Sequence, residues 1–193
     1  MRIDLGDFND IKKHIHSRLL SNEFHLDRLK GIYKIPVTES LYLTFFISLG
    51  EQISIPITGH MVDMLKIGVS DLKRAAKSNS RYAVKSINEL FGFEIDAFRT
   101  GLADVCIVTN LSAQGGASAI LDKRVQDQLS ERFPNGYFVI PSSVDETLII
   151  HNDLDTDKIC QMIHDINRNY VEESLRLSDH LYAIRDGQLV VVA

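Results

Sequence analysis

The chain has 193 residues, a length that fits one domain of ordinary size. Hydrophobic residues make up 45% and charged residues 24%, which excludes disorder over most of the length. The formal net charge of −5 argues against a sequence-independent electrostatic grip on DNA or RNA, but permits binding to a basic surface that normally holds nucleic acid. Residues 1–7 do not resemble a signal peptide, and no apolar run reaches the ~18 residues of a membrane span. We therefore expect a cytoplasmic protein with no membrane partner.

Apolar residues recur at helical spacing near the N-terminus. Phe8, Ile11, Ile15 and Leu19 follow one another at intervals of three, four and four residues. This spacing predicts an amphipathic helix over residues 8–20.

The next segments alternate between apolar and polar positions. Residues 31–35, 41–49 and 53–57 are each predicted to form a strand, and the segment 41–49 has apolar residues on both faces, as in a central strand. Gly50 and Glu51 are expected to form the turn of a hairpin. From residue 58 the period becomes helical up to residue 91, with a break at Gly68 and a second short helix over 82–91.

The last ninety residues alternate between strands and helices. The predicted strands are 105–109, 117–121, 137–140, 147–150, 181–184 and 188–192. One helix is expected to begin after Asp122 and another after Asp155 or Thr156. The last two strands flank Asp186 and Gly187, and this pair is typical of a tight hairpin turn.

These elements follow no strict βαβ rhythm and include several hairpins. They predict an α+β fold, with a single domain, a mixed or antiparallel sheet, helices packed on that sheet and an N-terminal amphipathic helix. Within the domain, residues 1–57 would form a helix plus hairpin, 58–91 a helical segment, and 102–193 the α+β core.

Short phrases of the sequence resemble, in order and spacing, a bacterial family known only as a domain of unknown function. They are GVSDL (68–72), VTN (108–110), GGASAIL (115–121), IPSSVDE (140–146), IN (166–167) and LSDHLY (177–182). Together they span about residues 57–185. The resemblance implies a source among gut anaerobes and mobile elements and a cytoplasmic accessory role, without an assigned reaction.

A fainter similarity connects the chain with small type II anti-CRISPR proteins. It rests on Asn167, which lies on the last predicted helix at a comparable distance from the C-terminus. The chain departs from that pattern one helical turn later, where Val171 stands in place of an Arg and Arg168 is the nearest basic residue. The similarity implies a Cas nuclease or its guide RNA as a partner.

Two adjacent serines form the first candidate for catalysis. Ser142 and Ser143 lie between two predicted strands, where a loop can present polar groups. A nucleophile such as Ser143 needs a base within hydrogen-bond reach and a third group that orients the base. His151 and His164 are the nearest histidines in sequence, and Asp145 could orient one of them. The alternative is a Ser-rich turn whose hydroxyls satisfy backbone N–H groups.

The last helix supplies the second candidate, formed by His164, Asn167 and Arg168. His164 and Arg168 are four residues apart and share a helix face. Together with Ser143 they could bind phosphate or assist RNA cleavage, with His as acid or base and Arg stabilising charge on phosphorus. The alternative is a solvated helix face, with Asn167 capping a neighbouring loop.

Basic residues cluster in one stretch, and Lys73, Arg74, Lys77 and Arg81 are the candidate nucleic-acid-binding residues. Arg74, Lys77 and Arg81 fall at helical spacing if the helix continues that far. Tyr82 is the only aromatic residue among them, which is thin for a stacking platform. The alternative is an ordinary solvated helix face.

The sequence contains no HxxxH or CxxC spacing, so we expect no metal and no cofactor. Cys106 and Cys160 have apolar neighbours and are expected to be buried free thiols.

These observations leave three hypotheses about function. The first is an accessory phage or mobile-element protein that binds and inhibits a host nucleic-acid defence machinery, such as a type II CRISPR effector or its guide RNA. The second is a small phosphodiesterase or ribonuclease that acts on RNA. The third is a protein–protein interaction module. Whether the protein is an enzyme, and which oligomeric state it adopts, are left open by the sequence.

Overall fold

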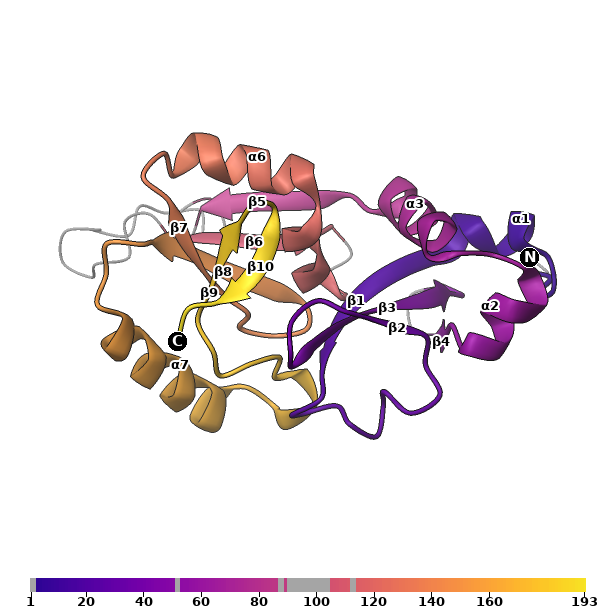
Figure 1. Ribbon diagram of the computed structural model, residues 1–193, viewed down its shortest axis with the longest axis horizontal. Coiled ribbons are helices and arrows are strands. Elements are labelled where there is room, and N and C mark those ends of the chain that lie inside the picture. The colour runs from indigo at the N-terminus through magenta and orange to yellow at the C-terminus, as the bar shows by residue number, and fades with distance from the viewer. Residues whose placement is uncertain (1–2, 51–52, 87–88, 90–104, 112–113) are drawn as a thin grey trace. The chain divides into compact units, whose positions relative to one another are not determined.

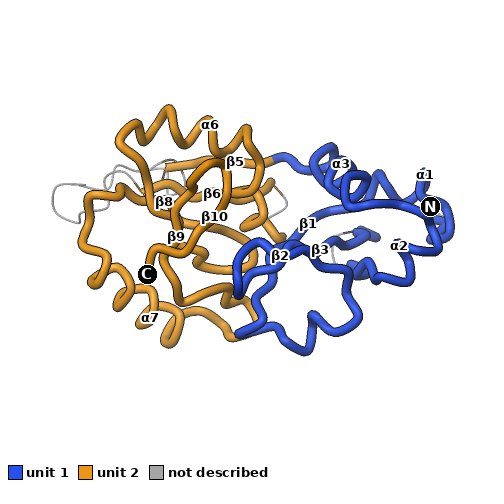
Figure 2. The backbone as a smooth tube through the Cα atoms, viewed as in Figure 1, with its two compact units in different colours: residues 1–81 blue, residues 82–193 orange. Residues whose placement is uncertain are grey.

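The computed structural model describes residues 3–50, 53–86, 89, 105–111 and 114–193. The chain divides into two compact units, residues 1–81 (unit 1) and residues 82–193 (unit 2), as Figure 2 shows. Each unit combines an antiparallel sheet with helices, which confirms the α+β class.

Unit 1 contains a four-stranded sheet and short helices (Figure 1). Its elements are α1 (Phe8–Ile11), the 3₁₀ helix η1 (Lys12–His14), β1 (Ile15–Ser21), β2 (Lys34–Pro36), β3 (Leu41–Ser48), β4 (Ser54–Pro56), α2 (Gly59–Leu65) and α3 (Val69–Asn79). The long strand β3 pairs with β1, β2 and β4, always antiparallel. The expected hairpin between β3 and β4 is confirmed, although Glu51 lies outside the described residues.

The predicted helix over residues 8–20 is wrong beyond residue 14, because residues 15–21 form β1. Ile15 and Leu19 are four residues apart, and an even spacing fits one face of a strand as well as one face of a helix. The pairing of β1 with β3, from Ile15 opposite Ile47 onward, decides between the two. The N-terminal helix is therefore short.

Helix α3 packs against β1 and is tied to it by Asn79. The Asn79 side-chain amide donates to the carbonyl oxygens of Lys12 and Ile15, at 2.8 Å each. The predicted helix break at Gly68 is confirmed, because α3 begins directly after it. There the Asp71 carboxylate accepts the Gly68 backbone N–H at 3.0 Å.

Unit 2 is built on a six-stranded antiparallel sheet in the order β10-β9-β7-β8-β6-β5. Its elements are β5 (Tyr82–Ser86), β6 (Cys106–Asn110), the 3₁₀ helix η2 (Gly116–Leu121), α6 (Lys123–Arg132), β7 (Tyr137–Ile140), β8 (Glu146–His151), α7 (Thr156–Tyr170), the 3₁₀ helix η3 (Glu173–Leu175), β9 (Tyr182–Arg185) and β10 (Gln188–Val191). The predicted helices after Asp122 and Asp155 are confirmed, as is the C-terminal hairpin.

The helices α6 and α7 cover opposite faces of this sheet (Figure 1). Phe133, at the end of α6, contacts the rings of Tyr137 and His151, which lie opposite each other on β7 and β8. Ile159 of α7 belongs instead to a buried cluster with Phe138, the next residue along β7. Because neighbouring residues of a strand point to opposite faces, the sheet is buried on both sides.

Two predicted elements of unit 2 are wrong. The segment predicted as a helix over 82–91 begins with strand β5, and its part at 87–88 and 90–91 lies outside the described residues. The segment predicted as a strand over 117–121 is the 3₁₀ helix η2, in which Gly116 to Ile120 are all buried. A short apolar run without alternation fits a buried helix as well as a buried strand, so only its neighbours decide.

Candidate functional site

The buried amide of Asn167 is the centre of the polar cluster on α7. The residue is 3% exposed, and its Nδ2 donates to the Ser178 carbonyl oxygen at 3.0 Å and to Asp179 Oδ1 at 2.6 Å. These bonds tie the helix to the segment that leads into β9. Asn167 therefore caps a neighbouring loop, as the second of the two interpretations above expected.

The same carboxylate connects Asn167 with His164. Asp179 Oδ2 lies 3.7 Å from His164 Nδ1, and the His164 side chain is 62% exposed. This distance is longer than a hydrogen bond, so the carboxylate lies beside the exposed imidazole without fixing its orientation. The structure thus brings His164 and Asn167 together through Asp179, a residue that the candidate set did not include.

Arg168 lies on the exposed side of α7, and its backbone carbonyl accepts a bond from Arg176 Nη2 at 3.5 Å. Arg176 Nε also donates to the Val171 carbonyl oxygen at 3.0 Å. Arg176 therefore satisfies carbonyl groups at the C-terminal end of α7. A basic residue shortly after a helix end was the sequence signal for this role.

The two serines bond within their own loop. Ser142 Oγ donates to the Glu146 carbonyl oxygen at 3.3 Å, and Ser143 Oγ accepts the Asp145 backbone N–H at 3.2 Å. Within the described part of the chain, no hydrogen bond or ion pair joins either serine to the α7 residues. The four predicted catalytic residues therefore do not form one hydrogen-bonded set.

A second cluster of hydrogen bonds surrounds Asp145, next to the serines. Asp145 Oδ1 accepts the Gly115 N–H at 2.6 Å, and its carbonyl oxygen accepts the Thr109 hydroxyl at 2.8 Å. Gly116 sits so close to these groups that a Cβ atom would lie 2.5 Å from Thr109 Oγ1 and 2.7 Å from the Asn110 nitrogen. The two glycines thus permit a close backbone approach, as their sequence suggested.

The family comparison covers almost the whole chain. The description "Family of unknown function (DUF5688)" matches residues 2–185, which cover most of both units. The chain belongs to the DUF5688 family. No curated protein and no solved structure matches it. The family match extends further toward the N-terminus than the resemblance over residues 57–185.

The phrases that carried the resemblance meet one another in the DUF5688 structure. The hydrogen-bond cluster around Asp145 is formed by the phrases at 108–110, 115–121 and 140–146. Those at 166–167 and 177–182 meet where Asn167 bonds Ser178 and Asp179. These phrases therefore carry structural hydrogen bonds between segments that are distant in the sequence.

Near the two serines, the carboxyl of Glu146 has a shifted pKa. Burial raises the pKa of its carboxyl, and the neighbouring charge of Asp145 raises it further, while an interaction with the Ser142 side chain opposes the shift. A carboxyl with a raised pKa can serve in proton transfer, but it is also an ordinary result of partial burial.

The basic candidates of the DUF5688 chain lie on the outer face of α3 and just beyond it. Lys73, Arg74 and Lys77 are exposed, and Arg74 Nη1 lies 3.8 Å from Asp71 Oδ1. The condition that the helix continues to Arg81 is not met, since α3 ends at Asn79. Arg81 follows on the linking segment and is exposed.

Among the described residues, no group of three His, Cys, Asp or Glu side chains could hold a metal ion. Cys106 is buried and Cys160 partly buried, both as free thiols, and burial raises the pKa of Cys160. In the same part of the chain, no helix is both long and apolar enough to span a membrane. Unit 1 also has a hollow of about 440 Å³, lined by Ile3, Leu5, His14, Ser48, Leu49 and Gly50, which includes none of the predicted site residues.

Proposed function

We propose that this DUF5688 chain is a cytoplasmic accessory protein of a phage or mobile element, and that it inhibits a host nucleic-acid defence machinery by binding to it. Its target would be a type II CRISPR effector, alone or with its guide RNA. The source and the target rest on the sequence resemblance. The proposed mode of action, binding through acidic residues of unit 2, is supported by the charges of that unit and by exposed residues on α7.

The separation of charge between the two units carries the proposal. Unit 2 holds 17 acidic and 9 basic side chains, a net charge of −8, whereas unit 1 holds 9 acidic and 12 basic side chains, a net charge of +3. An acidic surface is complementary to the basic channel in which a nuclease holds its nucleic acid, and such complementarity speeds association and favours the matching partner.

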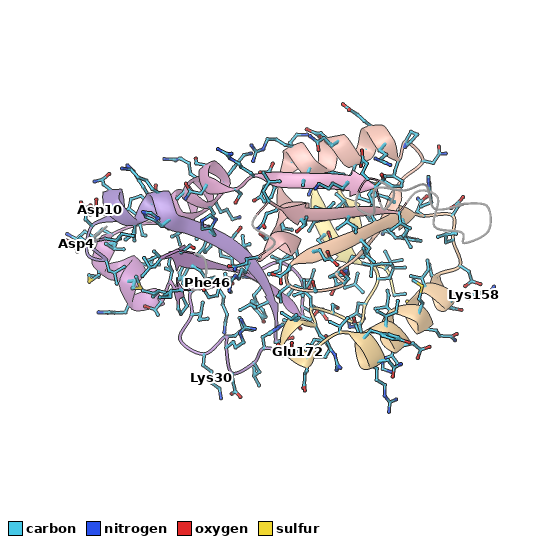
Figure 3. All side chains as sticks on the ribbon, turned by 180° about the vertical axis from the view of Figure 1, so that it is seen from behind. Asp4, Asp10, Lys30, Phe46, Lys158 and Glu172 are labelled. Carbon is cyan, nitrogen blue, oxygen red and sulfur yellow. The ribbon has the colours of Figure 1, made fainter. Side chains whose placement is uncertain are left out.

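Helix α7 offers the contact residues for such a surface. Met162, Ile166 and Tyr170 recur every four residues along it and are 44%, 39% and 84% exposed. The helix and the turn after it also carry the exposed acids Asp157, Asp165, Glu172 and Glu173. In Figure 3, Lys158 and Glu172 mark the two ends of this segment. An exposed tyrosine beside carboxylates is a suitable anchor for a basic partner.

The hydrogen bonds of the predicted site favour binding over catalysis. Asn167 and the two serines already bond to backbone groups, which is the structural role of such side chains. A nucleophile or an anion-binding amide would need those atoms for the substrate.

The proposal is tested by pull-down of a purified type II effector with the full chain, with and without guide RNA, together with an assay of target DNA cleavage. We expect co-elution and protection of the DNA. Changing Asp165, Glu172 and Glu173 to Lys should abolish both, as should Tyr170→Ala. A control with the same change of charge in unit 1, at Asp10, Asp27 and Asp63, should retain both. Absence of co-elution in every arm would remove the proposal.

The His164–Asp179 pair favours a second candidate, an RNA-cleaving enzyme. His164 would accept the proton of a ribose 2′-hydroxyl as that oxygen attacks phosphorus. The P–O5′ bond would break to leave a 2′,3′-cyclic phosphate, the departing 5′-oxygen would take a proton from water, and Arg168 would stabilise the charge on the phosphoryl oxygens. Incubating guide RNA with the chain and the effector, then measuring RNA length, tests this reaction. The reaction is supported if the RNA is shortened by the unmodified chain but stays full length with the His164→Ala variant. Full-length RNA with the unmodified chain would exclude it.

A further inference from the structure

We infer that the hollow in unit 1 binds a small amphipathic carboxylate, whose apolar chain lies against Ile3, Leu5 and Leu49 and whose carboxylate accepts a hydrogen bond from His14. The hollow lies where three segments of unit 1 meet: the chain before α1, the end of η1 and the residues that follow β3. The inference concerns unit 1 alone and does not depend on the proposed inhibition of a defence machinery.

Hydrogen bonds hold the wall that precedes α1. The Gly6 N–H donates to Asp4 Oδ1 at 2.8 Å, and the Asp4 N–H donates to Asp10 Oδ2 at 3.4 Å. Both acids are labelled in Figure 3. Ile3 and Leu5 flank Asp4 in the sequence, so these bonds fix the backbone from which both wall side chains extend. The Asp4 carboxylate is thereby committed to its own segment.

The wall after β3 has hydrogen bonds of its own as well. Ser48 Oγ donates to the Gly50 carbonyl oxygen at 3.0 Å, and the Leu49 N–H donates to the Ile53 carbonyl oxygen at 2.8 Å. Because these bonds hold the described wall segments before a ligand arrives, little conformational entropy is lost when it binds.

The hollow is large enough and open enough for a small molecule. Its volume of about 440 Å³ falls within the ~300–1,000 Å³ of small-ligand sites. Leu5 is 37% exposed and the other side chains that line the hollow are partly exposed, so a ligand can reach them. At Gly50 an added Cβ atom would meet nothing within 4 Å, so this side of the hollow is open.

Three of the six lining residues give the hollow an apolar wall. Ile3, Leu5 and Leu49 contribute aliphatic side chains. A hydrocarbon chain placed against them is removed from water, and each fully buried methylene group raises the affinity by up to about fourfold. A short hydrocarbon chain therefore fits this wall better than a sugar or a free phosphate.

His14 and Ser48 supply the polar side chains of the hollow. The Ser48 hydroxyl donates to Gly50, which leaves the His14 imidazole as the side-chain donor for a ligand oxygen. None of the described lining residues is acidic, so an ammonium group would meet no opposite charge. Lys12 and Lys13 directly precede His14, and unit 1 has a net charge of +3, which favours an anion.

The test uses NMR spectroscopy of the full, ¹⁵N-labelled chain with octanoate as the probe. We expect saturable shifts of the backbone amide signals of Leu5, His14 and Leu49. Octan-1-ol should bind about tenfold more weakly, because it keeps the chain but lacks the charge that strengthens the bond to His14. Butanoate should also bind at least about tenfold more weakly, because it lacks four methylene groups.

His14→Phe tests the polar contact, because it keeps an aromatic ring and removes both nitrogen atoms. It should reduce the preference for octanoate over octan-1-ol from about tenfold to about twofold or less, a ratio that a general loss of packing would not change. His60→Phe is the matched control, since His60 is exposed on α2 and is not among the described residues that line the hollow. It should keep the preference.

Leu5→Glu tests the apolar wall at an exposed position and should abolish octanoate binding, with circular dichroism showing a folded chain. Leu26→Glu makes the same change at a residue of unit 1 that is 62% exposed and outside the hollow, and should bind octanoate normally. The inference is overturned if octanoate causes no saturable shift, if octan-1-ol binds as tightly, or if His14→Phe keeps the full preference. Co-sedimentation with vesicles of phosphatidylcholine and phosphatidylglycerol that Leu5→Glu abolishes would overturn it in favour of a membrane surface.

Discussion

Asn167 on α7 donates from its side-chain amide to Asp179 Oδ1 at 2.6 Å, across eleven intervening residues of chain. The same amide bonds the Ser178 carbonyl, and the same carboxylate faces His164. One buried amide therefore joins the main helix of unit 2 to the last hairpin of its sheet.

We expect Asn167→Ala to lower the free energy of unfolding by about 1–3 kcal/mol, because it leaves buried polar groups without their partner. Urea denaturation measures this difference. Asn169→Ala is the matched control, since Asn169 is exposed on the same helix and its side chain donates to the Asp165 carbonyl. It should change stability by less than about 0.5 kcal/mol. Equal effects of the two variants would contradict a special role of Asn167.

Gly116→Ala should destabilise the chain by about 3 kcal/mol, because the added methyl group would collide with backbone and side-chain atoms around Asp145 that cannot move independently. Thermal unfolding measures the loss. At Gly59, the first residue of α2, an added Cβ meets nothing within 4 Å. Gly59→Ala should therefore raise stability by about 0.5 kcal/mol. If Gly116→Ala left the stability unchanged, the packing around Asp145 would be less tight than described.

Glu146→Gln should change how stability depends on pH. Burial and the Asp145 charge raise the pKa of Glu146 in the folded chain above its usual value of 4.5. Below that value both states are protonated, whereas on raising the pH the unfolded chain releases its proton first, which favours unfolding. The stability of the Gln variant relative to the unmodified chain should therefore increase as the pH rises above about 4.5 and level off beyond the folded pKa. Urea denaturation over a pH series measures it, and a difference independent of pH would contradict the shift.

Gly187→Ala should lower the free energy of unfolding by about 1 kcal/mol, because Gly187 has a φ of 74° in the turn between β9 and β10. An added Cβ would meet only Gln126 Oε1 at 3.7 Å, so the cost comes from backbone conformation and not from a clash. Gly187→Asn should cost less, since Asn tolerates positive φ. Denaturation of both variants distinguishes this explanation from a steric one, which would make the larger Asn side chain worse.

The sequence predicted well those elements whose patterns have one solution. In the segment 41–49 every second residue is apolar, and Asp122 and Asp155 cap helices with side-chain carboxylates that accept backbone N–H groups of the first turn. Prediction failed where a pattern fits two structures. Ile15 and Leu19 suit a helix or a strand, and the compact run 117–121 suits a strand or a 3₁₀ helix, so pairing with distant segments decided both.

The candidate site could be predicted from the sequence even less completely than the fold. The residue types on α7 were visible in the sequence, but Asp179, which joins two of them, was not in the candidate set because it lies in a loop after the helix. The row that places Arg18 and Lys34 on either side of Thr44 was likewise out of reach, since it arises only from the strand register.

The sequence by itself determined the α+β class, most strand and helix positions and the C-terminal turn, because those depend on local periodicity, capping and backbone freedom. Only the tertiary structure decided which polar groups satisfy one another and where the charges lie, because hydrogen bonds between distant segments and shared sheet faces depend on strand pairing, and one residue of register shift would send every side chain to the opposite face.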